Sequence, residues 1–212
     1  MLFRSISFTL SANEALDSAT IAASDFTVTN GGTPTITGTG STRTITVTAS
    51  GQGNVTIAPS GTFSISDIAG NAQGTAGGTD RSVTFDSIAP TVTLAQAGGQ
   101  SDPTKTAAIA FSFTSSEALD GATVTQSDFT ASNGSITGFS GSGTSWTITV
   151  TAAADGNVTV APSGTFSVAD TAGNTQGTAG GSDRQVTYDT AAPTLDRKST
   201  RLNSSHTDIS RM

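Results

Sequence analysis

The side chains of this sequence that could do chemistry are its carboxylates. Among 212 residues there are 16 aspartates and glutamates, 9 lysines and arginines, one histidine and no cysteine. The absence of cysteine excludes a disulfide framework, a thiolate metal site and a cysteine nucleophile. Metal binding by oxygen ligands remains possible, because carboxylates that lie close together can bind Ca²⁺, which takes about six to eight oxygen ligands.

The carboxylates follow an internal repeat, because the chain matches itself at an offset of 103 residues. Between positions 54–92 and 157–195, 28 of 39 residues are identical. Six acidic pairs keep the offset: Glu14/Glu117, Asp17/Asp120, Asp25/Asp128, Asp67/Asp170, Asp80/Asp183 and Asp86/Asp189. Duplication of the unit could by itself explain why these acidic pairs are kept. Whether they form a binding site therefore depends on where the fold places them.

The composition predicts an all-β fold for the elements that must position these acids. The chain contains 40 threonines, 29 serines and 24 glycines. Threonine is β-branched and suits a pleated surface, whereas glycine and serine suit turns. Chains of this composition are often disordered, but here Ile, Val, Leu and Phe recur at alternate positions, which a disordered linker does not need.

Seven strands are predicted in the second unit, at 91–96, 107–114, 128–132, 135–139, 146–152, 157–161 and 184–189. The alternation that supports them is clearest in Ile109/Phe111/Phe113, Trp146/Ile148/Val150, Val158/Val160 and Val186/Tyr188. We interpret Asp155-Gly156 as a tight hairpin turn, with Gln52-Gly53 as its counterpart, because the glycine supplies a positive φ. Asn30-Gly31 and Asn133-Gly134 lie between the third and fourth strands, and the glycine-rich stretch 177–181 is expected to loop before the last one.

A unit of about 100 residues with many short strands has the size of an immunoglobulin-like β-sandwich. The predicted fold is therefore all-β, with tandem immunoglobulin-like sandwiches of about seven antiparallel strands each. The first unit spans 1–88, the second spans 89–191, and 192–195 begins a third. Only five residues precede Ile6, so we expect the first unit to lack its N-terminal strand and to expose an unpaired edge.

Both ends of the sequence suggest a piece of a longer reading frame. We interpret Met1 as a start inside that frame, so a missing signal peptide says nothing about secretion. After Leu195 the repeat pattern stops, and Asp196–His206 resembles one reading frame of a widely used sequencing adapter. We therefore expect 196–212 to be disordered read-through rather than protein sequence.

Topology predicts where the acids of the second unit meet. In a seven-stranded antiparallel sandwich, the turn after strand two, the turn after strand six and the start of strand one share a pole. Carboxylates converging there form a cluster of hard oxygen ligands that suits Ca²⁺. The predicted calcium ligands are Asp86, Glu117, Asp120, Asp128, Asp170 and Asn174, with incomplete sites at Glu14, Asp67 and Asp189.

The same residues also have a purely structural interpretation. Aspartate and asparagine in turns commonly bond their own backbone, so Asp170 and Asn174 could simply shape a loop. Asp183 and Arg184 could form a surface ion pair worth under about 1 kcal/mol. Trp146 is interpreted as a core residue rather than a sugar-stacking platform, because it lies in strand alternation.

Several function classes are excluded or disfavoured. An isoelectric point near 4.3 is the opposite of the basic footprint that nucleic-acid binding needs. No apolar run approaches the ~20 residues that cross a bilayer. We predict that the chain is not an enzyme, since it lacks a credible base, a nucleophile and a phosphate-binding loop.

Five motifs together resemble one family. They are Phe-Ser-Phe-Thr-Ser-Ser-Glu-Ala-Leu, Ser-Asp-Phe-Thr-Ala-Ser-Asn-Gly, Gly-Asn-Val-Thr-Val, Ala-Asp-Thr-Ala-Gly-Asn and Asp-Thr-Ala-Ala-Pro. The sequence over 1–195 thereby resembles the bacterial Ig-like repeats of very large surface and secreted proteins, including adhesins. The resemblance implies extracellular repeats, often in long arrays, that calcium frequently makes rigid near their junctions. The chain departs from the family in the glycine-rich insertion 175–182.

The expected function is mechanical. Tandem sandwiches would form a stalk of a bacterial surface or secreted adhesin, with neighbouring repeats as partners and any host ligand bound by other domains. The alternatives are a module that itself binds a glycan or a protein, or an accessory module of a secreted polysaccharide-degrading enzyme.

Overall fold

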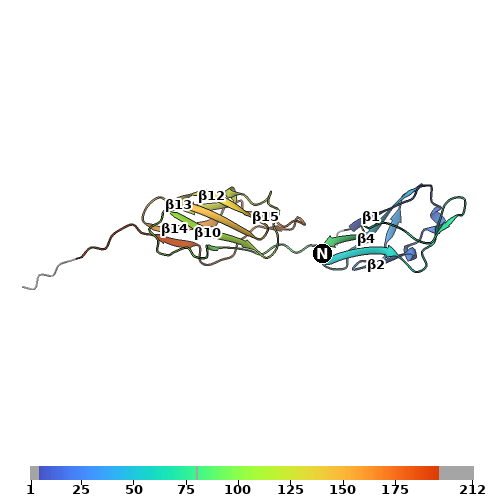
Figure 1. Ribbon diagram of the computed structural model, residues 1–212, viewed down its shortest axis with the longest axis horizontal. Coiled ribbons are helices and arrows are strands. Elements are labelled where there is room, and N and C mark those ends of the chain that lie inside the picture. Colours follow the sequence, from blue (N-terminus) through green and yellow to red (C-terminus); the bar gives the residue numbers. More distant parts are fainter. Residues whose placement is uncertain (1–4, 80, 196–212) are drawn as a thin grey trace, which may run out of the picture.

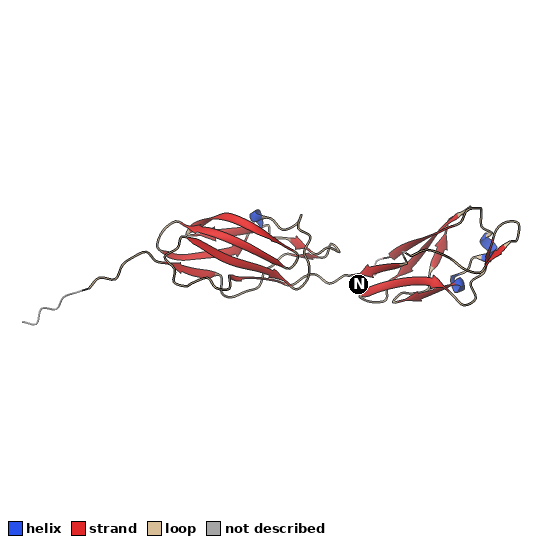
Figure 2. Cartoon of the chain, viewed as in Figure 1, coloured by secondary structure: helices blue, strands red, loops and turns tan. Residues whose placement is uncertain are grey.

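The computed structural model describes residues 5–79 and 81–195. Figure 1 shows two elongated β-sandwiches that lie end to end and are joined by a single connecting segment. Strands dominate both bodies, and the described helices are three-residue 3-10 turns at Ser18–Thr20, Ala23–Asp25 and Gln126–Asp128 (Figure 2). The segment 196–212 lies outside the described residues.

The second sandwich has the seven strands that the sequence predicts, divided between a four-stranded and a three-stranded sheet. The first sheet has the order β12-β13-β10-β9 and the second β11-β14-β17. The bounds are β9 (Val92–Gln96), β10 (Ala108–Ser115), β11 (Phe129–Ser132), β12 (Gly134–Ser142), β13 (Ser145–Ala152), β14 (Gly156–Pro162) and β17 (Gln185–Tyr188). Every pairing between them is antiparallel.

The first sandwich repeats this arrangement without a described counterpart of β9. Its sheets have the orders β1-β4-β3 and β2-β5-β8. The bounds are β1 (Ser5–Ser11), β2 (Phe26–Thr29), β3 (Thr35–Thr37), β4 (Thr42–Thr48), β5 (Gly53–Pro59) and β8 (Ser82–Phe85). The prediction of tandem immunoglobulin-like sandwiches is confirmed, and within residues 5–79 and 81–88 the first sandwich has no counterpart of β9.

The core of the second sandwich forms because alternate residues of each strand point inward. Ile109, Phe111 and Phe113 of β10 have no exposed surface, and Ile148 and Val150 of β13 pack opposite them in the same core. The ring of Phe113 meets those of two further phenylalanines edge to face, at 5.1 Å from Phe129 and 6.0 Å from Phe166. Threonine and serine cover most of the outward faces of these strands.

Trp146 belongs to this core, as its place in the alternation predicts. Its side chain is buried and stacks on Phe139 with ring centroids 5.5 Å apart. The equivalent position in the first sandwich holds Arg43, which is also buried. Its guanidinium donates hydrogen bonds to the carbonyl oxygens of Gly40, Thr42 and Leu16, so the charged group has polar partners.

The interpretation of Asp155-Gly156 as a hairpin turn is wrong. The strands on either side, β13 and β14, belong to different sheets, so the chain crosses from one sheet to the other at this turn. Gly156 does have the expected positive φ of 130°, as Gly53 has 100° in the first unit. A tight reversal needs this backbone conformation whether the next strand pairs with the previous one or faces it across the core, so the dipeptide could not distinguish them.

Two short strand pairs were not predicted. They are β6 (Ile65–Ser66) with β7 (Ala72–Gln73), and β15 (Val168–Ala169) with β16 (Thr175–Gln176). Each pair has two residues per strand, too few to show a period of two in the sequence. The turn that each pair encloses carries one of the repeated aspartates.

We expect Ile148→Ala to lower the free energy of unfolding of the second sandwich by about 2–5 kcal/mol, because it opens a cavity in a core without exposed surface. The fluorescence of Trp146, the only tryptophan, reports unfolding of this unit in urea. The control Thr147→Ala changes an exposed neighbour and should cost less than about 1 kcal/mol. Equal losses for both variants would contradict the assigned core.

Candidate metal centre

Asp170 is the most buried residue of the predicted calcium site. It follows β15, and only 2% of its surface is exposed. Its Oδ1 accepts hydrogen bonds from the backbone N–H groups of Ala172 (2.8 Å) and Asn174 (2.9 Å), and its Oδ2 accepts one from the side-chain amide of Asn174 (2.8 Å). Burial opposes ionisation, but these hydrogen bonds hold the pKa of Asp170 below its ordinary value.

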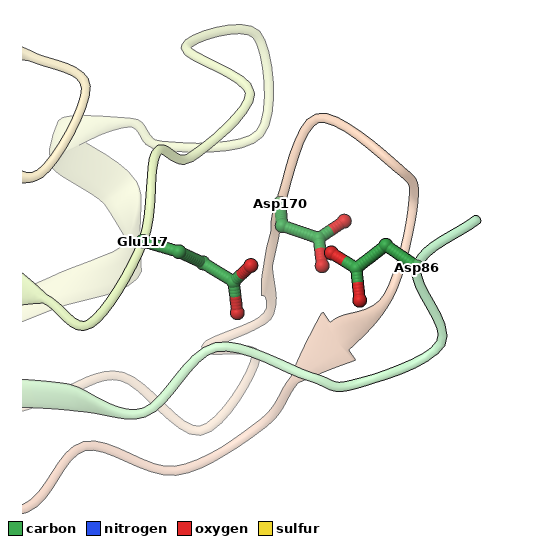
Figure 3. Close-up of side chains that lie close together, drawn as sticks. All are labelled: Asp86, Glu117 and Asp170. Atoms are coloured by element: carbon green, nitrogen blue, oxygen red, sulfur yellow. The ribbon is translucent and has the colours of Figure 1, made fainter. Parts of the chain in front are cut away.

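Glu117 reaches the same end of the sandwich from the loop after β10. Backbone contacts bring its loop to the Asp170 turn, since Leu119 forms a β-bridge with Asp170 and the N–H of Asp120 donates to the carbonyl of Ala169 at 2.9 Å. The loop is therefore positioned by main-chain hydrogen bonds, and the Glu117 side chain projects from it toward Asp170 (Figure 3).

Asp86 comes from the segment that connects the two sandwiches. On the side of the first unit, the Gln52 amide donates to Asp86 Oδ1 at 3.3 Å, and Gln52 Oε1 accepts the N–H of Ser87 at 3.0 Å. On the side of the second unit, the N–H of Thr91 donates to the Ser116 hydroxyl at 2.9 Å. Both ends of this short connection are therefore held, which places the Asp86 carboxylate over the second sandwich.

The three carboxylates converge. Asp86, Glu117 and Asp170 each offer an oxygen within 4.8 Å of the others, and Figure 3 shows their carboxyl groups facing a common point. Burial, then repulsion from Asp86 and Asp170, raises the pKa of Glu117 above its ordinary value. Three hard oxygen donors with mutual repulsion are the donor set that suits a divalent cation such as Ca²⁺.

The other predicted ligands of this junction lie elsewhere or act indirectly. Asp120 Oδ1 accepts the N–H of Ala122 at 3.0 Å, and Asp128 Oδ2 accepts the N–H and hydroxyl of Thr125 at 2.7 and 2.9 Å. Both carboxylates thus cap local turns, which is the structural interpretation that the sequence left open. The Asn174 amide reaches the cluster only through its bond to Asp170.

The incomplete sites keep the local geometry of the complete one. Asp67 holds its turn as Asp170 does, accepting hydrogen bonds from the backbone and side-chain amides of Asn71 at 2.8 and 2.7 Å, and these lower its pKa. Glu14 lines the same cleft as Asp67. Asp189 is exposed and accepts the N–H of Ala191 at 2.9 Å, just as Asp86 accepts that of Ile88 at 3.0 Å.

Gln52 is the residue that sequence reasoning missed. It was interpreted only as a turn residue, yet its side chain binds the start of the connecting segment. In the second unit Asp155 occupies the same position and accepts hydrogen bonds from the N–H and hydroxyl of Thr190 at 3.0 and 2.8 Å. The sequence signal that could have identified Gln52 is that both units carry a hydrogen-bonding side chain at this position.

The fold defines the protein as one built from immunoglobulin-like β-sandwiches, with an acidic cluster where the connecting segment meets the second one. Residues 86–190 match the family described as bacterial Ig-like domain, and this part of the chain belongs to that family. Such domains are typically non-catalytic structural modules and are common in surface or secreted proteins. Comparison with curated proteins and with solved structures gives no match. Among the described residues, no helix has the length and apolar character needed to cross a membrane.

We expect Glu117→Gln to raise the Tm of the second sandwich in calcium-free buffer at pH 7, because it removes a charge that its neighbours repel. The folded-state pKa of Glu117 is raised, so the wild type loses stability as pH rises through that pKa. The advantage of the variant should therefore shrink as the pH is lowered toward the ordinary pKa of glutamate. Melting curves between pH 4 and 7, followed by Trp146 fluorescence, measure this.

The matched control is Glu14→Gln in the first unit, where no connecting-segment carboxylate faces the side chain among the described residues. It should change the melting of the first sandwich much less. A Glu117→Gln effect that is the same at pH 4.5 and pH 7 would show that charge repulsion is not its cause.

Proposed function

We propose that this chain is a segment of an extracellular stalk, in which tandem sandwiches hold another domain of a surface or secreted protein away from the cell, and that Ca²⁺ stiffens the joint between them. The observation that carries the proposal is the placement of Asp86, on the connecting segment, within 4.8 Å of Glu117 and Asp170 on the body of the second sandwich.

A cation at this point would act as a clamp. The connecting segment is tied to the first unit by Gln52 and to the second by Ser116, and few residues separate these ties. Bending of the joint must change the position of Asp86 relative to Glu117 and Asp170. A bound cation would oppose that change by attracting all three carboxylates, whereas without it their repulsion favours separation.

The surface of the described residues also supports a spacer rather than a ligand-binding module. The large hydrophobic side chains that are exposed are Ile68, Val83, Ile88 and Leu195. None of them is aromatic, and the chain's single tryptophan is buried in the second core. An aromatic platform for sugar stacking is therefore not among these exposed side chains.

We expect 1 mM Ca²⁺ to raise the Tm of the second sandwich by about 10–20 °C relative to EGTA, since a ligand at about 100 times its Kd contributes about 2.7 kcal/mol. Asp86→Asn should abolish most of this shift. The control Asp189→Asn changes the equivalent aspartate after the second unit and should leave the shift intact. Small-angle scattering should show a narrower distribution of interdomain distances with calcium than with EGTA.

Two results would contradict the calcium clamp. One is a Tm that is the same with Ca²⁺ and EGTA. The other is a shift that Asp86→Asn and Asp189→Asn reduce equally, since that would place the effective ion away from the joint. If the scattering did not change when calcium was removed, the three carboxylates would be explained as turn-forming residues alone.

A further inference from the structure

An asparagine stands at the turn where each unit crosses from one sheet to the other, after β2 in the first sandwich and after β11 in the second. Asn30 and Asn133 are the described residues other than glycine that have a positive φ, at 55° and 53°. Asparagine tolerates this left-handed conformation better than most residues, which accounts for its presence at both turns. Each is followed by a glycine, Gly31 or Gly134.

The glycine after each asparagine is required by packing. A Cβ on Gly31 would collide with Cγ1 of Val47 and would lie 2.9 Å from Cγ1 of Val28. A Cβ on Gly134 would lie 2.6 Å from the carbonyl oxygen of Thr151. A larger residue therefore does not fit at either position without a shift of its neighbours. The fold thus imposes the dipeptide Asn-Gly at the same crossing in both units.

The side chain of Asn30 holds the turn from which the first sandwich reaches the joint. Its Nδ2 donates hydrogen bonds to the carbonyl oxygens of Gly51 at 3.0 Å and Gln52 at 3.1 Å. The side chain of Gln52 in turn donates to Asp86 Oδ1 and accepts the N–H of Ser87 on the connecting segment. A single amide group therefore supports the tie between the first sandwich and this segment.

The Asn-Gly dipeptide is chemically labile. Glycine has no Cβ to hinder its backbone nitrogen from attacking the side chain of the preceding asparagine. The N–H of Gly32 donates to the carbonyl of Thr48, and the carbonyl of Asn30 accepts the N–H of Ser50. The N–H of Gly31, which lies between these two bonds, donates to no acceptor among the described residues. The attacking nitrogen is therefore not held by a hydrogen bond.

We propose that Asn30 is a site of spontaneous deamidation, with water as the only co-reactant, and that its conversion loosens the hold of the first sandwich on the connecting segment. The Gly31 nitrogen loses its proton and forms a bond to Cγ of Asn30, which gives a succinimide ring. The bond from Cγ to Nδ2 breaks, and the leaving nitrogen takes up a proton and departs as ammonia. Water then opens the ring at Cγ to give aspartate, or at the main-chain carbonyl carbon to give isoaspartate.

The rate of this reaction is linked to the stability of the turn. Nδ2 is both the leaving group and the donor of the two hydrogen bonds to Gly51 and Gln52, so the turn must release it before it departs. We expect the rate to follow the local opening of this turn. It should also rise with pH, because the attacking nitrogen of Gly31 must lose its proton.

The product no longer supports the turn. A carboxylate cannot donate, so both hydrogen bonds of Asn30 are lost and a negative charge faces the carbonyl oxygens of Gly51 and Gln52. Isoaspartate also lengthens the main chain by a carbon atom next to Gly31, where the packing leaves little room. In both products the turn that carries Gln52 is less firmly held, and so is the connecting segment.

Peptide mapping by mass spectrometry tests the site in the full, folded chain. During incubation at 37 °C the peptide that contains Asn30 should gain the mass of deamidation, in an aspartate and an isoaspartate form, and faster at pH 9 than at pH 7. Asn54 and Asn71 precede valine and alanine, so they are internal controls that should stay unchanged. The chain unfolded in guanidinium chloride shows that conversion is detected. The proposal is overturned if the folded chain keeps Asn30 as intact as Asn54.

The variant Asn30→Asp supplies the aspartate product directly and tests its effect on the joint. We expect it to lower the Tm of the first sandwich in calorimetry by about 8–16 °C, since two hydrogen bonds of ordinary strength are lost. It should also broaden the distribution of interdomain distances in small-angle scattering. If this variant does not fold, the deamidated fraction of aged wild-type chain, separated by anion exchange, provides the same measurement.

The matched control is Asn133→Asp. It removes the equivalent bond, from Asn133 Nδ2 to the carbonyl of Ala154, in a turn that does not hold the segment between the two sandwiches. It should therefore leave the distribution of interdomain distances as in the wild type. Equal broadening by both variants, or broadening by neither, would overturn the effect on the joint.

All these measurements are made in EGTA, so they are independent of the proposed calcium clamp. Deamidation of Asn30 and a broadened distance distribution would support the present proposal even if Ca²⁺ had no effect on melting. Conversely, an intact Asn30 would overturn it and leave a calcium-dependent Tm of the second sandwich unexplained by any change at this turn.

Discussion

Each sheet of this chain has one apolar face, and the structure depends on packing the apolar faces of two sheets against each other. Threonine and serine make the strands polar on one side, so the remaining alternate positions supply nearly all the material of the core. Two such sheets bury their faces together, and the strands of the pair are connected at the ends of the sandwich. The turns that carry carboxylates lie at those ends, where backbone N–H groups outside the sheets donate to the carboxylates.

The fold followed from the sequence wherever the alternation was long enough. β10, β13, β14 and β17 were predicted within one or two residues, since each carries apolar residues at every second position. The two-residue strands β15 and β16 were missed because they are shorter than one period of any pattern. The Asp155-Gly156 turn was assigned to a hairpin because local backbone preference is the same in a hairpin and in a crossing between sheets.

The site was predictable to the level of which acids share a pole, but not which of them face one another. Asp86, Glu117 and Asp170 were correctly expected at one end of the second sandwich, and they lie together. Asp120 and Asp128 are near in sequence, but the 3-10 and turn segments around them offer free N–H groups that their carboxylates accept. Which backbone amide a carboxylate caps is decided by the loop conformation, and a residue pattern does not contain that information. For the same reason Gln52, whose contact depends on the path of the connecting segment, gave no prediction.

The antiparallel pairing of β9 with β10 has a consequence for a chain under tension. The connecting segment enters the second sandwich directly into β9, along the long axis of the molecule (Figure 1). A pull on that segment therefore slides β9 lengthwise past β10, and hydrogen bonds that run across the strands are loaded side by side. Bonds loaded in this shearing geometry must rupture together, whereas a strand peeled from its end loses them one by one. The strand that the connecting segment enters is therefore the one that a pull on this segment loads in shear.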